Sequence, residues 1–411
     1  MPEYDYLVVG GGLTAVNAVE GLRQVDARGT VAVLSAEEEP PYHRPPLSKE
    51  YLQAAGAGRE LLHVKPGGWW EEQDGVELLS GVRATALDPG EMVVEASDGE
   101  PHAADRILLA TGGRPAKLDV PGRSLEGVGT FRTVEDAERL REAAERVDRA
   151  VLVGAGFIGM ELAASLRELD VAPTVVELED RVWSRMLPPE LSAEMQSYFE
   201  DRGVEFRPGA SVSEFRGDGR LEAAALDDGS ELACGLAVVG VGIRPNQELA
   251  AEAGLAVEDG VLVDEFGETS HGHVYAAGDV ARFPDPVFGD RVRVEHWDHA
   301  KAHGRRVGRN LAGEREPYDH LSYFFTDVFD LSVNVFGRPA GADRTVRRGE
   351  ILDGEGGIVL CGSDGRLCGA LLFNDTDSMD ACRELVRRRP PMDEVEGRLA
   401  DPEVDLAEMA G

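Results

Sequence analysis

The stretch Val151-Leu152-Val153-Gly154-Ala155-Gly156-Phe157-Ile158-Gly159-Met160-Glu161 decides the fold of this chain. Aliphatic residues run into Gly154 as in a buried strand, and apolar residues at helical spacing follow Gly159. In such a pattern Gly154 allows a tight turn, Gly156 lets a pyrophosphate approach the backbone, and Gly159 lets the helix pack against the strand. The sequence therefore predicts a strand, a glycine turn and a helix whose positive N-terminal end faces phosphates.

An acidic residue follows where a dinucleotide ribose would be held. The strand Thr174-Val175-Val176 ends in Glu177, about 20 residues beyond the turn. A carboxylate at this place accepts a hydrogen bond from a ribose 2′-OH and repels a 2′-phosphate, so the sequence predicts a preference for NADH over NADPH. Arg181 and Arg185 lie just downstream and leave a weaker preference open. A glycine-rich turn without a ligand is the plain alternative, but strand, helix and acid together favour a nucleotide site.

A second turn of the same kind stands near the N-terminus. An aliphatic strand over residues 6–9 runs into Gly10-Gly11-Gly12-Leu13-Thr14-Ala15, and a helix through Leu22 and a strand over residues 30–34 follow. The first glycines of the two turns are 144 residues apart (154 minus 10). Two dinucleotide folds in one chain predict two dinucleotides held face to face, as electron transfer from a nicotinamide to a flavin requires.

Length and charge limit the possible classes. A chain of 411 residues is long enough for two or three domains, and it contains no run of 18 apolar residues that would predict a transmembrane helix. A strand that starts at Tyr4 leaves no room for a signal peptide, so we expect a cytoplasmic protein. The net charge of −35 argues against nucleic acid and anionic membranes as partners.

The basic residues are unevenly chosen. Only four are lysines, and the other 38 (42 minus 4) are arginines. The lysines are Lys49, Lys65, Lys117 and Lys301. Adaptation to a salty cytoplasm and genome composition combined with solubility both explain such a balance, and the sequence does not separate them.

Cysteines and histidines give no sign of a metal centre or a disulfide. The cysteines are Cys234, Cys361, Cys368 and Cys382. None forms a C-x-x-C pair, so buried free thiols are expected in a reducing compartment. His299 and His303 would share one helical face, with His271 and His273 upstream, but the support of carboxylate or thiolate ligands is missing. We predict structural histidines and no metal.

Other strand-and-turn patterns surround these two folds. A proline-rich loop covers residues 41–49, and its plain interpretation is a rigid surface connection. Buried strands end in turns at Gly112, Gly242 and Gly278. Asp279 follows the last of them, either as a helix N-cap or as an acceptor for a sugar-like hydroxyl. From Tyr318 the chain becomes rich in aromatic residues and predicts a separate domain of strands and helix, with a partly mobile stretch from residue 393.

Taken together, the motifs resemble the FAD-dependent pyridine nucleotide-disulfide oxidoreductases over the whole chain. The resemblance is strongest to the branch that holds NADH:ferredoxin and rubredoxin reductases, apoptosis-inducing-factor-like proteins and monodehydroascorbate reductases. The motifs that carry it are Gly10-Gly11-Gly12, Arg44-Pro45-Pro46-Leu47-Ser48-Lys49, Ala110-Thr111-Gly112, Gly154 to Glu161, Ala276-Ala277-Gly278-Asp279, and Glu295-His296-Trp297-Asp298-His299-Ala300.

The resemblance implies a role for particular residues. The N-terminal fold would bind FAD and the middle fold NADH, while Lys49 near flavin N5 would pair with Glu161 as the catalytic pair. The FAD contacts implied are Gly10, Gly12, Ala15, Glu37, Arg44, Lys49, Ala110, Thr111, Gly112, Gly278, Asp279 (on the ribityl chain), Glu295, His296 and Trp297. The NADH contacts implied are Gly154, Gly156, Phe157, Ile158, Gly159, Glu161, Glu177, Arg185 and Gly242. For Glu161, the alternative is an acid in the first turn of a helix that only stabilises that helix. For His296 and Trp297, the alternative to a place beside the flavin ring is ordinary packing. Beside the ring, Trp297 would be an exit for electrons.

Two departures from the family pattern matter. Ala36 stands where the family has an acid for the FAD ribose, and Glu37 would substitute through a shift of one residue. No cysteine precedes Cys234, so the cysteine pair of the disulfide reductases and the single cysteine of the peroxidases are both missing. Electrons would therefore pass from the flavin directly to an outside acceptor.

The sequence thus predicts an α/β protein with two Rossmann-like domains and a C-terminal α+β domain. The expected boundaries are 1–115 with 245–317 for FAD, 116–244 for NADH and 318–411 for the last domain. The expected activity is electron transfer from NADH through FAD to a ferredoxin or related iron–sulfur protein, by a monomer or homodimer. Reduction of a small molecule (a quinone, a monodehydroascorbate-like radical or oxygen) and a slow, apoptosis-inducing-factor-like redox sensor remain alternatives.

Overall fold

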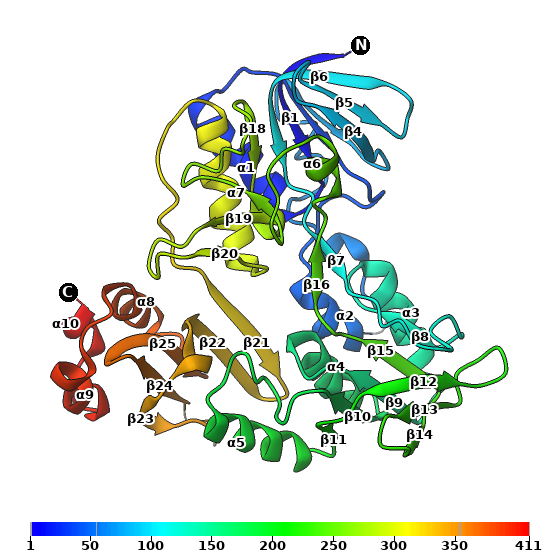
Figure 1. The fold of residues 1–411 in the computed structure, drawn as a ribbon, viewed down its shortest axis with the longest axis vertical. Coiled ribbons are helices and arrows are strands. Elements are labelled where there is room, and N and C mark those ends of the chain that lie inside the picture. Colours follow the sequence, from blue (N-terminus) through cyan, green and yellow to red (C-terminus); the bar gives the residue numbers. More distant parts are fainter. Residues whose placement is uncertain (1, 55, 353, 355, 411) are drawn as a thin grey trace. The chain divides into compact units, whose positions relative to one another are not determined.

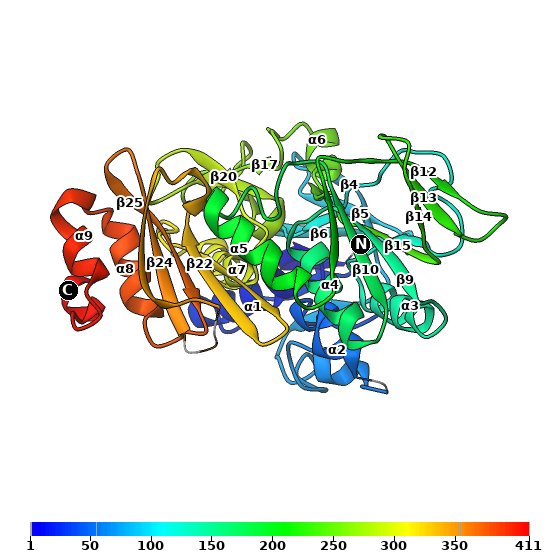
Figure 2. The ribbon, with the colours of Figure 1, turned by 90° about the horizontal axis from the view of Figure 1, so that it is seen from below.

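Each glycine turn lies at the end of a central strand in its own parallel sheet. The computed structural model describes residues 2–54, 56–352, 354 and 356–410. Contacts divide the chain into a first unit (residues 1–43, 58–114 and 243–322) and a second unit (44–57, 115–242 and 323–411). Residues 44–57 thus group with the second unit, although the sequence placed them in the FAD-binding domain. The division into three domains stays a prediction. Figures 1 and 2 show the elements in two views.

The sheet of the first unit is built around β1 (Glu3–Val9). Its strand order is β3-β2-β1-β6-β5-β4, and β18 also pairs with β6. On either side of β1, parallel pairing sets Val8 opposite Val33 of β2 and Leu108 of β6. The other strands of this sheet are β2 (Val31–Leu34), β3 (Val76–Leu79), β4 (Ala84–Asp88), β5 (Val93–Ala96), β6 (Pro101–Leu109) and β18 (Val274–Ala276). The remaining elements of the unit are η2 (Arg59–Leu62), β16 (Ile243–Pro245), α6 (Glu248–Glu252), β17 (Val261–Leu262), η3 (Gly278–Val280), β19 (Ala281–Pro284) and β20 (Arg291–Arg293). The short strand β7 (Gly113–Pro115) pairs with β16.

Alternation along β1 divides the core of this unit into two layers. Tyr6 and Val8 join the cluster under helices α1 (Leu13–Val25) and α7 (Trp297–Leu311). Leu7 and Val9 point to the opposite face and pack with residues from β4 to β19. Because successive side chains of a strand point to opposite faces, an all-aliphatic strand is what a sheet covered on both sides requires.

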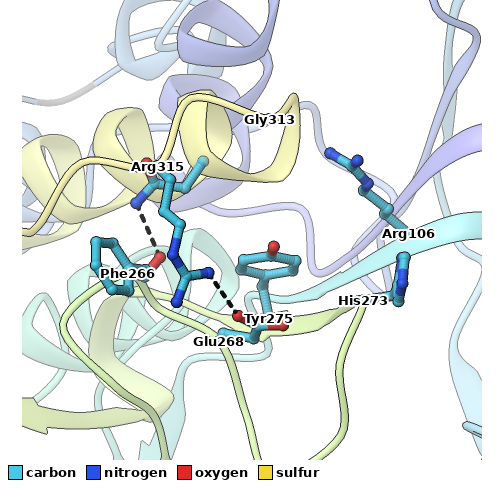
Figure 3. A pocket seen from close by; sticks show the side chains of 8 residues that line it. Arg106, Phe266, Glu268, His273, Tyr275, Gly313 and Arg315 are labelled. Atoms are coloured by element: carbon cyan, nitrogen blue, oxygen red, sulfur yellow. Dashed lines mark hydrogen bonds and ion pairs between the residues drawn. The ribbon is translucent and has the colours of Figure 1, made fainter.

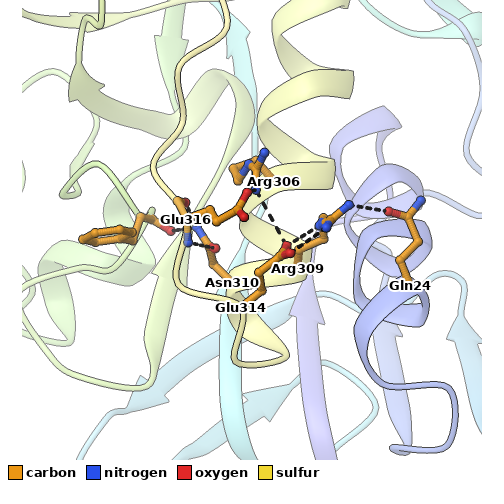
Figure 4. A network of polar contacts seen from close by, with 7 residues as sticks. Gln24, Arg306, Arg309, Asn310, Glu314 and Glu316 are labelled. Atoms are coloured by element: carbon orange, nitrogen blue, oxygen red, sulfur yellow. Dashed lines mark hydrogen bonds and ion pairs between the residues drawn. The ribbon is translucent and has the colours of Figure 1, made fainter.

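Helices α1 and α7 pack with their backbones in close contact, as Figure 1 shows. A Cβ atom at Gly304 would lie 2.5 Å from the carbonyl oxygen of Thr14, and one at Gly308 would lie 2.1 Å from that of Ala18. One turn further along α7, Arg309 donates to Gln24 of α1 at 3.0 Å and to Glu314 at 2.6 Å (Figure 4). Glycines at the contact and arginines at its end therefore fix α7 against the sheet.

The second unit repeats the design with strand order β11-β10-β9-β15-β8. Strand β9 (Arg149–Val153) runs into α4 (Phe157–Glu168), which returns to β10 (Ala172–Glu177), while β15 (Leu236–Val239) pairs on the other side of β9. The order of strands reverses between β9 and β15, and ligands bind at such a switch point in open α/β sheets. The other elements are β8 (Val128–Thr130), α3 (Val134–Ala144), α5 (Pro189–Glu200), β11 (Glu205–Pro208), β12 (Val212–Arg216), β13 (Ala223–Leu226), β14 (Glu231–Ala233), η1 (Pro45–Ser48) and α2 (Glu50–Gln53).

An antiparallel sheet forms the last part of the second unit, in the order β21-β22-β25-β24-β23. Its elements are β21 (Tyr323–Val328), β22 (Leu331–Gly337), η4 (Pro339–Gly341), β23 (Arg344–Glu350), β24 (Gly356–Ser363), β25 (Arg366–Phe373), α8 (Met379–Arg388), α9 (Met392–Ala400) and α10 (Leu406–Ala410). The expected mobile stretch is instead helical, and it buries Leu399, Leu406 and Met409. The predicted fold class is confirmed. Among the described residues, no helix is both long and apolar enough to cross a membrane.

We predict that Gly308→Ala lowers the free energy of unfolding by about 1–3 kcal/mol, because its Cβ would meet the α1 backbone, which cannot move aside. Gly397→Ala is the matched control in α9, where a Cβ would meet nothing within 4 Å. That control should stabilise the protein by about 0.5–1 kcal/mol through helix propensity. Thermal unfolding of both variants measures the effects, and equal shifts would contradict the close α1–α7 contact.

Candidate functional site

The first glycine turn leaves open space at the start of helix α1. A Cβ at Gly10 would lie 2.1 Å from the carbonyl oxygen of Ala110, so the turn packs against the end of β6. At Gly12, by contrast, a Cβ would meet no atom within 4 Å. Gly12 is also the N-cap of α1 and offers no side-chain cap. The free backbone N–H groups and the open space fit a phosphate, as the sequence predicted.

Two further predicted segments lie beside this turn. A Cβ at Gly278 would lie 2.2 Å from Thr14 Oγ1, which places the Ala-Gly-Asp turn against the first turn of α1. Asp279 belongs to η3, whose N-cap is Ala277, so the N-cap interpretation of Asp279 is wrong. The predicted Thr111 hydroxyl donates to the carbonyl of Asn246 at 2.7 Å, and Asn246 Nδ2 donates back to the carbonyl of Thr111 at 2.8 Å. Asn246 was missed from the sequence because its partner lies 135 residues away.

The acid for the FAD ribose remains a prediction. Ala36 is exposed, and the Glu37 carboxylate accepts a hydrogen bond from the Tyr42 hydroxyl at 2.7 Å. The Ser35 hydroxyl binds the Glu37 carbonyl at 3.0 Å. Both bonds hold Glu37 in place at the end of β2, where the predicted one-residue shift would put it.

The segment predicted to lie beside the flavin ring is held by polar contacts. Trp297 Nε1 donates to His43 Nδ1 at 3.1 Å, and the Lys301 ammonium lies 3.9 Å from the centre of the Trp297 ring. Burial lowers the pKa of His296 to about 4, although Asp279 and Asp298 oppose the shift. The roles of Asp279 and His296 at the flavin stay predictions. The Glu295 carboxylate instead forms an ion pair with Arg293.

The remaining histidines of α7 are structural. His299 and His303 are buried, and their rings lie 4.8 Å apart. His299 Nδ1 lies 3.0 Å from the Tyr318 hydroxyl, and His303 Nδ1 accepts a hydrogen bond from the N–H of Gly278 at 3.2 Å. Burial lowers the pKa of both imidazoles, that of His303 to about 3. In the described part of the chain no group of three or more metal-ligating side chains gathers in one place.

In the second unit, the second glycine turn has the same open design. Gly154 takes a φ of +104°, and its Cβ would lie 2.5 Å from the carbonyl of Gly240. A Cβ at Gly156 would meet nothing within 4 Å, whereas one at Gly159 would lie 2.0 Å from the Gly154 carbonyl. Helix α4 has Gly156 as N-cap without a side-chain bond, while α3 carries a complete capping box from Thr133. The uncapped N-terminus of α4 is thus free for an anion.

The Glu177 carboxylate lies directly at this turn. It accepts hydrogen bonds from the backbone N–H groups of Ala155 at 2.5 Å and Glu179 at 2.9 Å. Each oxygen keeps a lone pair for a ribose hydroxyl. Arg181, in contrast, binds the Asp180 carboxylate at 3.1 Å and the Ser184 carbonyl at 3.2 Å, and Arg185 is exposed.

The other predicted NADH contacts form the rim of the same edge. Ile158 follows the turn and Gly242 follows β15, and both are exposed. Two apolar neighbours, Leu178 and Val241, are unusually exposed as well, at 71% and 43%. Phe157 is half-buried, with its ring centre 4.4 Å from that of Phe324. These roles stay predictions.

The Lys49–Glu161 pair exists in the second unit and is buried. Lys49 Nζ lies 3.2 Å from Glu161 Oε1, with the two residues 8% and 5% exposed. Glu161 also accepts hydrogen bonds from the hydroxyls of Ser48 and Thr326. Arg44, predicted to contact FAD, donates to the carbonyl of Arg132 at 2.8 Å. Glu161 is the fifth residue of α4, outside its first turn, so the alternative of a first-turn acid is wrong.

The loop that carries Lys49 is attached to α4 by further bonds. Ser165 Oγ donates to the carbonyl of Ser48 at 2.6 Å, and Gln53 Nε2 donates to Ser165 Oγ at 3.0 Å. Ser48, Ser165 and Thr326 were all missed from the sequence, because no local pattern distinguishes these hydroxyls from others.

The cysteines are buried free thiols, as predicted. Burial raises the pKa of Cys234 and Cys368 to about 11 and that of Cys382 to about 12. Thiols held neutral in this way are poor nucleophiles and poor metal ligands.

A small pocket of the first unit lies near the C-terminal end of α7, and no predicted site residue lines it. Its volume is about 200 Å³, and Figure 3 shows Tyr275 between Arg106 and Arg315. Arg315 forms an ion pair with the Glu268 carboxylate at 3.3 Å, and its guanidinium lies over the Phe266 ring. The full lining is Arg106, Phe266, Glu268, His273, Tyr275, Asn310, Gly313 and Arg315.

Comparisons with known proteins agree with this geometry. Residues 4–304 match the family model described as pyridine nucleotide-disulphide oxidoreductase, and residues 323–410 match the model described as reductase C-terminal. The chain is similar to the ferredoxin reductase subunit of the 5,5′-dehydrodivanillate O-demethylase of a Sphingobium species, with 34% identity over 100% of this chain and 99% of that protein. It is also similar to putidaredoxin reductase of Pseudomonas putida, with 30% identity over 98% of this chain and 96% of that protein.

Solved structures agree as well. The ferredoxin reductase for the CYP199A2 system from Rhodopseudomonas palustris matches with a TM-score of 0.93 at 33% identity, over 99% of both chains. The covalent complex of putidaredoxin reductase with putidaredoxin matches with a TM-score of 0.92 at 30% identity, over 99% of this chain and 98% of that one.

We predict that His303 makes stability depend on pH. Because its folded pKa of about 3 lies below the ordinary 6.5, the unfolded chain takes up the proton first. This contribution is complete above pH 6.5 and is lost as the pH falls toward 3, at about 1.4 kcal/mol per pH unit. His303→Asn, which keeps an acceptor for Gly278, should flatten the dependence by that slope in unfolding measured between pH 4 and pH 7.

The control for this prediction is His273→Asn. His273 is exposed, and asparagine tolerates its φ of +72°. Its pH dependence should match that of the unmodified protein, and an equally flat curve in the control would refute the assignment to His303.

Proposed function

The chain belongs to the pyridine nucleotide-disulphide oxidoreductase family, and from this premise we propose that it is an FAD-dependent NADH oxidoreductase that reduces a ferredoxin or a related iron–sulfur protein. Members of this family and the related ferredoxin reductases use FAD and NAD(P)H. The observation that carries the proposal is the pair of open, uncapped glycine turns together with the buried Lys49–Glu161 pair. Two glycine turns for two dinucleotides and a buried charge pair suit oxidoreductase chemistry that uses no protein disulfide.

The residues of the chain divide the work between them. Gly12 and the start of α1 fit the pyrophosphate of FAD, and Gly156 with the start of α4 fits that of NADH. Bound at this site, FAD would supply the chemistry that takes up a hydride (two electrons and a proton) and passes electrons on singly. The Lys49 ammonium supplies positive charge to the negative charge that arises on reduction, and Glu161 fixes its position.

The acceptor is proposed from local charge and from missing thiols. No cysteine precedes Cys234, and all four described thiols are buried, so electrons leave without a thiol relay. Around Trp297, the Lys301 ammonium covers the ring, and both Lys301 and Lys65 act on the pKa of His43. Lys301 thus places a positive charge at this tryptophan, whereas Lys65 is paired with Glu20 and Asp298 follows the tryptophan in the sequence. The ammonium over the Trp297 ring suits the approach of an acidic electron-transfer partner.

The coenzyme preference follows from Glu177. Its carboxylate is fixed at the turn by two backbone N–H groups, and Arg181 is bound to Asp180 and Ser184. A 2′-phosphate at this place would meet the fixed negative charge of Glu177, which supports NADH over NADPH.

We also propose a cell compartment and an oligomeric state for the protein. NADH as the electron donor places the reaction in the cytoplasm, where this coenzyme is formed and where free thiols persist. A monomer or homodimer remains the expectation for the oligomeric state.

The function is tested by anaerobic stopped-flow mixing of the FAD-loaded protein with NADH, followed by a panel of acceptors. We expect a fast loss of the flavin absorbance after mixing with NADH. A [2Fe–2S] ferredoxin should then reoxidise the flavin within the time of one catalytic turnover. Faster reoxidation by a quinone or oxygen would replace the proposed acceptor with a small molecule. Slow reduction with a lasting charge-transfer band, whatever the acceptor, would favour a redox sensor instead.

We predict that Glu177→Gln narrows the ratio of NADH to NADPH efficiency (kcat/KM) by about tenfold, because a charge-assisted hydrogen bond to the ribose and the repulsion of the 2′-phosphate are both lost. Glutamine keeps one acceptor for the Ala155 N–H group, whereas its NH2 group cannot accept from the Glu179 N–H group, so the change in the ratio is diagnostic and a general loss of binding is not. Glu179→Ala, an exposed neighbour, is the control and should leave the ratio unchanged. An unchanged ratio in Glu177→Gln would move specificity to other residues, such as Arg185.

A further inference from the structure

Strand β21 of the C-terminal sheet brings four consecutive side chains to the Lys49–Glu161 pair and its helix. The Thr326 hydroxyl donates to Glu161 Oε1 at 2.8 Å, and Asp327 Oδ2 lies 4.0 Å from Lys49 Nζ. The centre of the Phe325 ring lies 5.3 Å from the Lys49 ammonium. The Phe324 ring lies 4.4 Å from that of Phe157, at the start of α4.

Because side chains alternate along a strand, these contacts divide between its two faces. Phe325 and Asp327 lie on one face of β21 and contact Lys49, while Phe324 and Thr326 lie on the other face and contact α4. β21 is the edge strand of its sheet, pairing only with β22 among the described strands, so its free edge is available to another element. The strand therefore reaches both members of the pair at once.

Glu161 depends on three donors from two segments that are distant from it in the chain. Its carboxylate is 5% exposed and binds the Ser48 hydroxyl, the Lys49 ammonium and the Thr326 hydroxyl. A buried carboxylate that loses a donor is left with an unsatisfied oxygen, which is costly in an apolar surrounding. Thr326 holds Oε1, the same oxygen that meets Lys49, and so it determines where this oxygen points.

Lys49 stands between two carboxylates of different exposure. The Glu161 side chain is 6% exposed and that of Asp327 is 46% exposed. Both attract the ammonium, and the face of the Phe325 ring adds a cation–π contact. The position and charge of Lys49 are therefore determined by α4 and β21 together.

We propose that Thr326 and Asp327 are positioning residues for the Lys49–Glu161 pair, and that β21 makes the C-terminal domain a part of the reductive site. Thr326 aims the Glu161 carboxylate, and Asp327 holds the Lys49 ammonium from the other side. The proposal rests on the proposed role of Lys49 in flavin reduction by NADH.

The kinetic test compares Thr326→Val with Thr326→Ser. Valine fills the same volume without the hydroxyl, and we expect flavin reduction by NADH to slow by about tenfold, the loss of one hydrogen bond to a charged group, at an unchanged KM for NADH. Serine restores the donor and should return the rate to within about twofold of the original, whereas Lys49→Met shows the full loss. Thr345→Val, on β23 of the same sheet, is the control.

A second measurement does not depend on activity. Acylation of lysine amines, followed by peptide mass spectrometry, reports the reactivity of Lys49 against Lys65, Lys117 and Lys301 as internal references. Asp327→Asn removes one of the two carboxylates that hold the ammonium in place, so Lys49 should be acylated about three times faster or more relative to the three reference lysines. Asp364→Asn, the same charge change on a distant hairpin where asparagine tolerates the φ of +52°, should leave Lys49 unchanged.

The outcomes separate the proposals. A rate in Thr326→Val equal to that of Thr345→Val, or no rescue by serine, refutes the positioning role of Thr326. Unchanged Lys49 acylation in Asp327→Asn, or an equal increase in Asp364→Asn, refutes the role of Asp327. If NADH does not reduce the unmodified protein, the proposed function fails, while the acylation experiment still tests the contact with Asp327.

Discussion

The buried ion pair between Lys49 and Glu161 is the interaction on which the second unit depends most. A carboxylate and an ammonium that are nearly removed from water need partners, and these come from the Arg-Pro-Pro-Leu-Ser-Lys loop, from helix α4 and from strand β21. Segments more than 100 residues apart in the chain are thereby fixed to one another. The loop of residues 44–57 accordingly groups with the coenzyme-binding sheet rather than with the N-terminal fold that precedes it in sequence.

The same physical device serves two nucleotides in one chain. At both Gly12 and Gly156, a helix begins without a side-chain cap and with open space above the backbone, whereas α3 supplies its own cap through Thr133. The two turns differ in the acid that follows. Glu177 is fixed to its turn by a backbone N–H group, while Glu37 is fixed by the hydroxyl of Tyr42. A rigid acid at the second turn supports the proposed preference between two coenzymes that differ by a single phosphate.

The chain departs from the chemistry that its family name suggests. The cysteines are buried with raised pKa values, Cys234 just after β14 and the other three in β24, β25 and α8, and none lies in the N-terminal glycine-rich fold. Three of the four lysines have specific partners. Lys49 is in the buried ion pair, Lys65 contacts Glu20 and the Trp69 ring, and Lys301 lies over the Trp297 ring. Each of these ammonium groups is thus held by a carboxylate, by an aromatic ring or by both.

The sequence by itself determined the two Rossmann-like folds, because glycines, aliphatic strands and helical periodicity are local properties that neighbouring residues express together. It also determined the family and, through resemblance, the Lys49–Glu161 pair, whereas the role of Glu177 toward NADH stays a prediction. Tertiary structure decided what local patterns cannot carry: that Thr326 and Asp327 reach this pair, that Asn246 closes the turn at Thr111, and that the C-terminal stretch folds into helices over Leu399 and Met409. Such contacts join residues far apart in the chain through single hydroxyl, amide or carboxylate groups. The sequence on either side of each residue does not distinguish it from an ordinary surface position until the chain has folded.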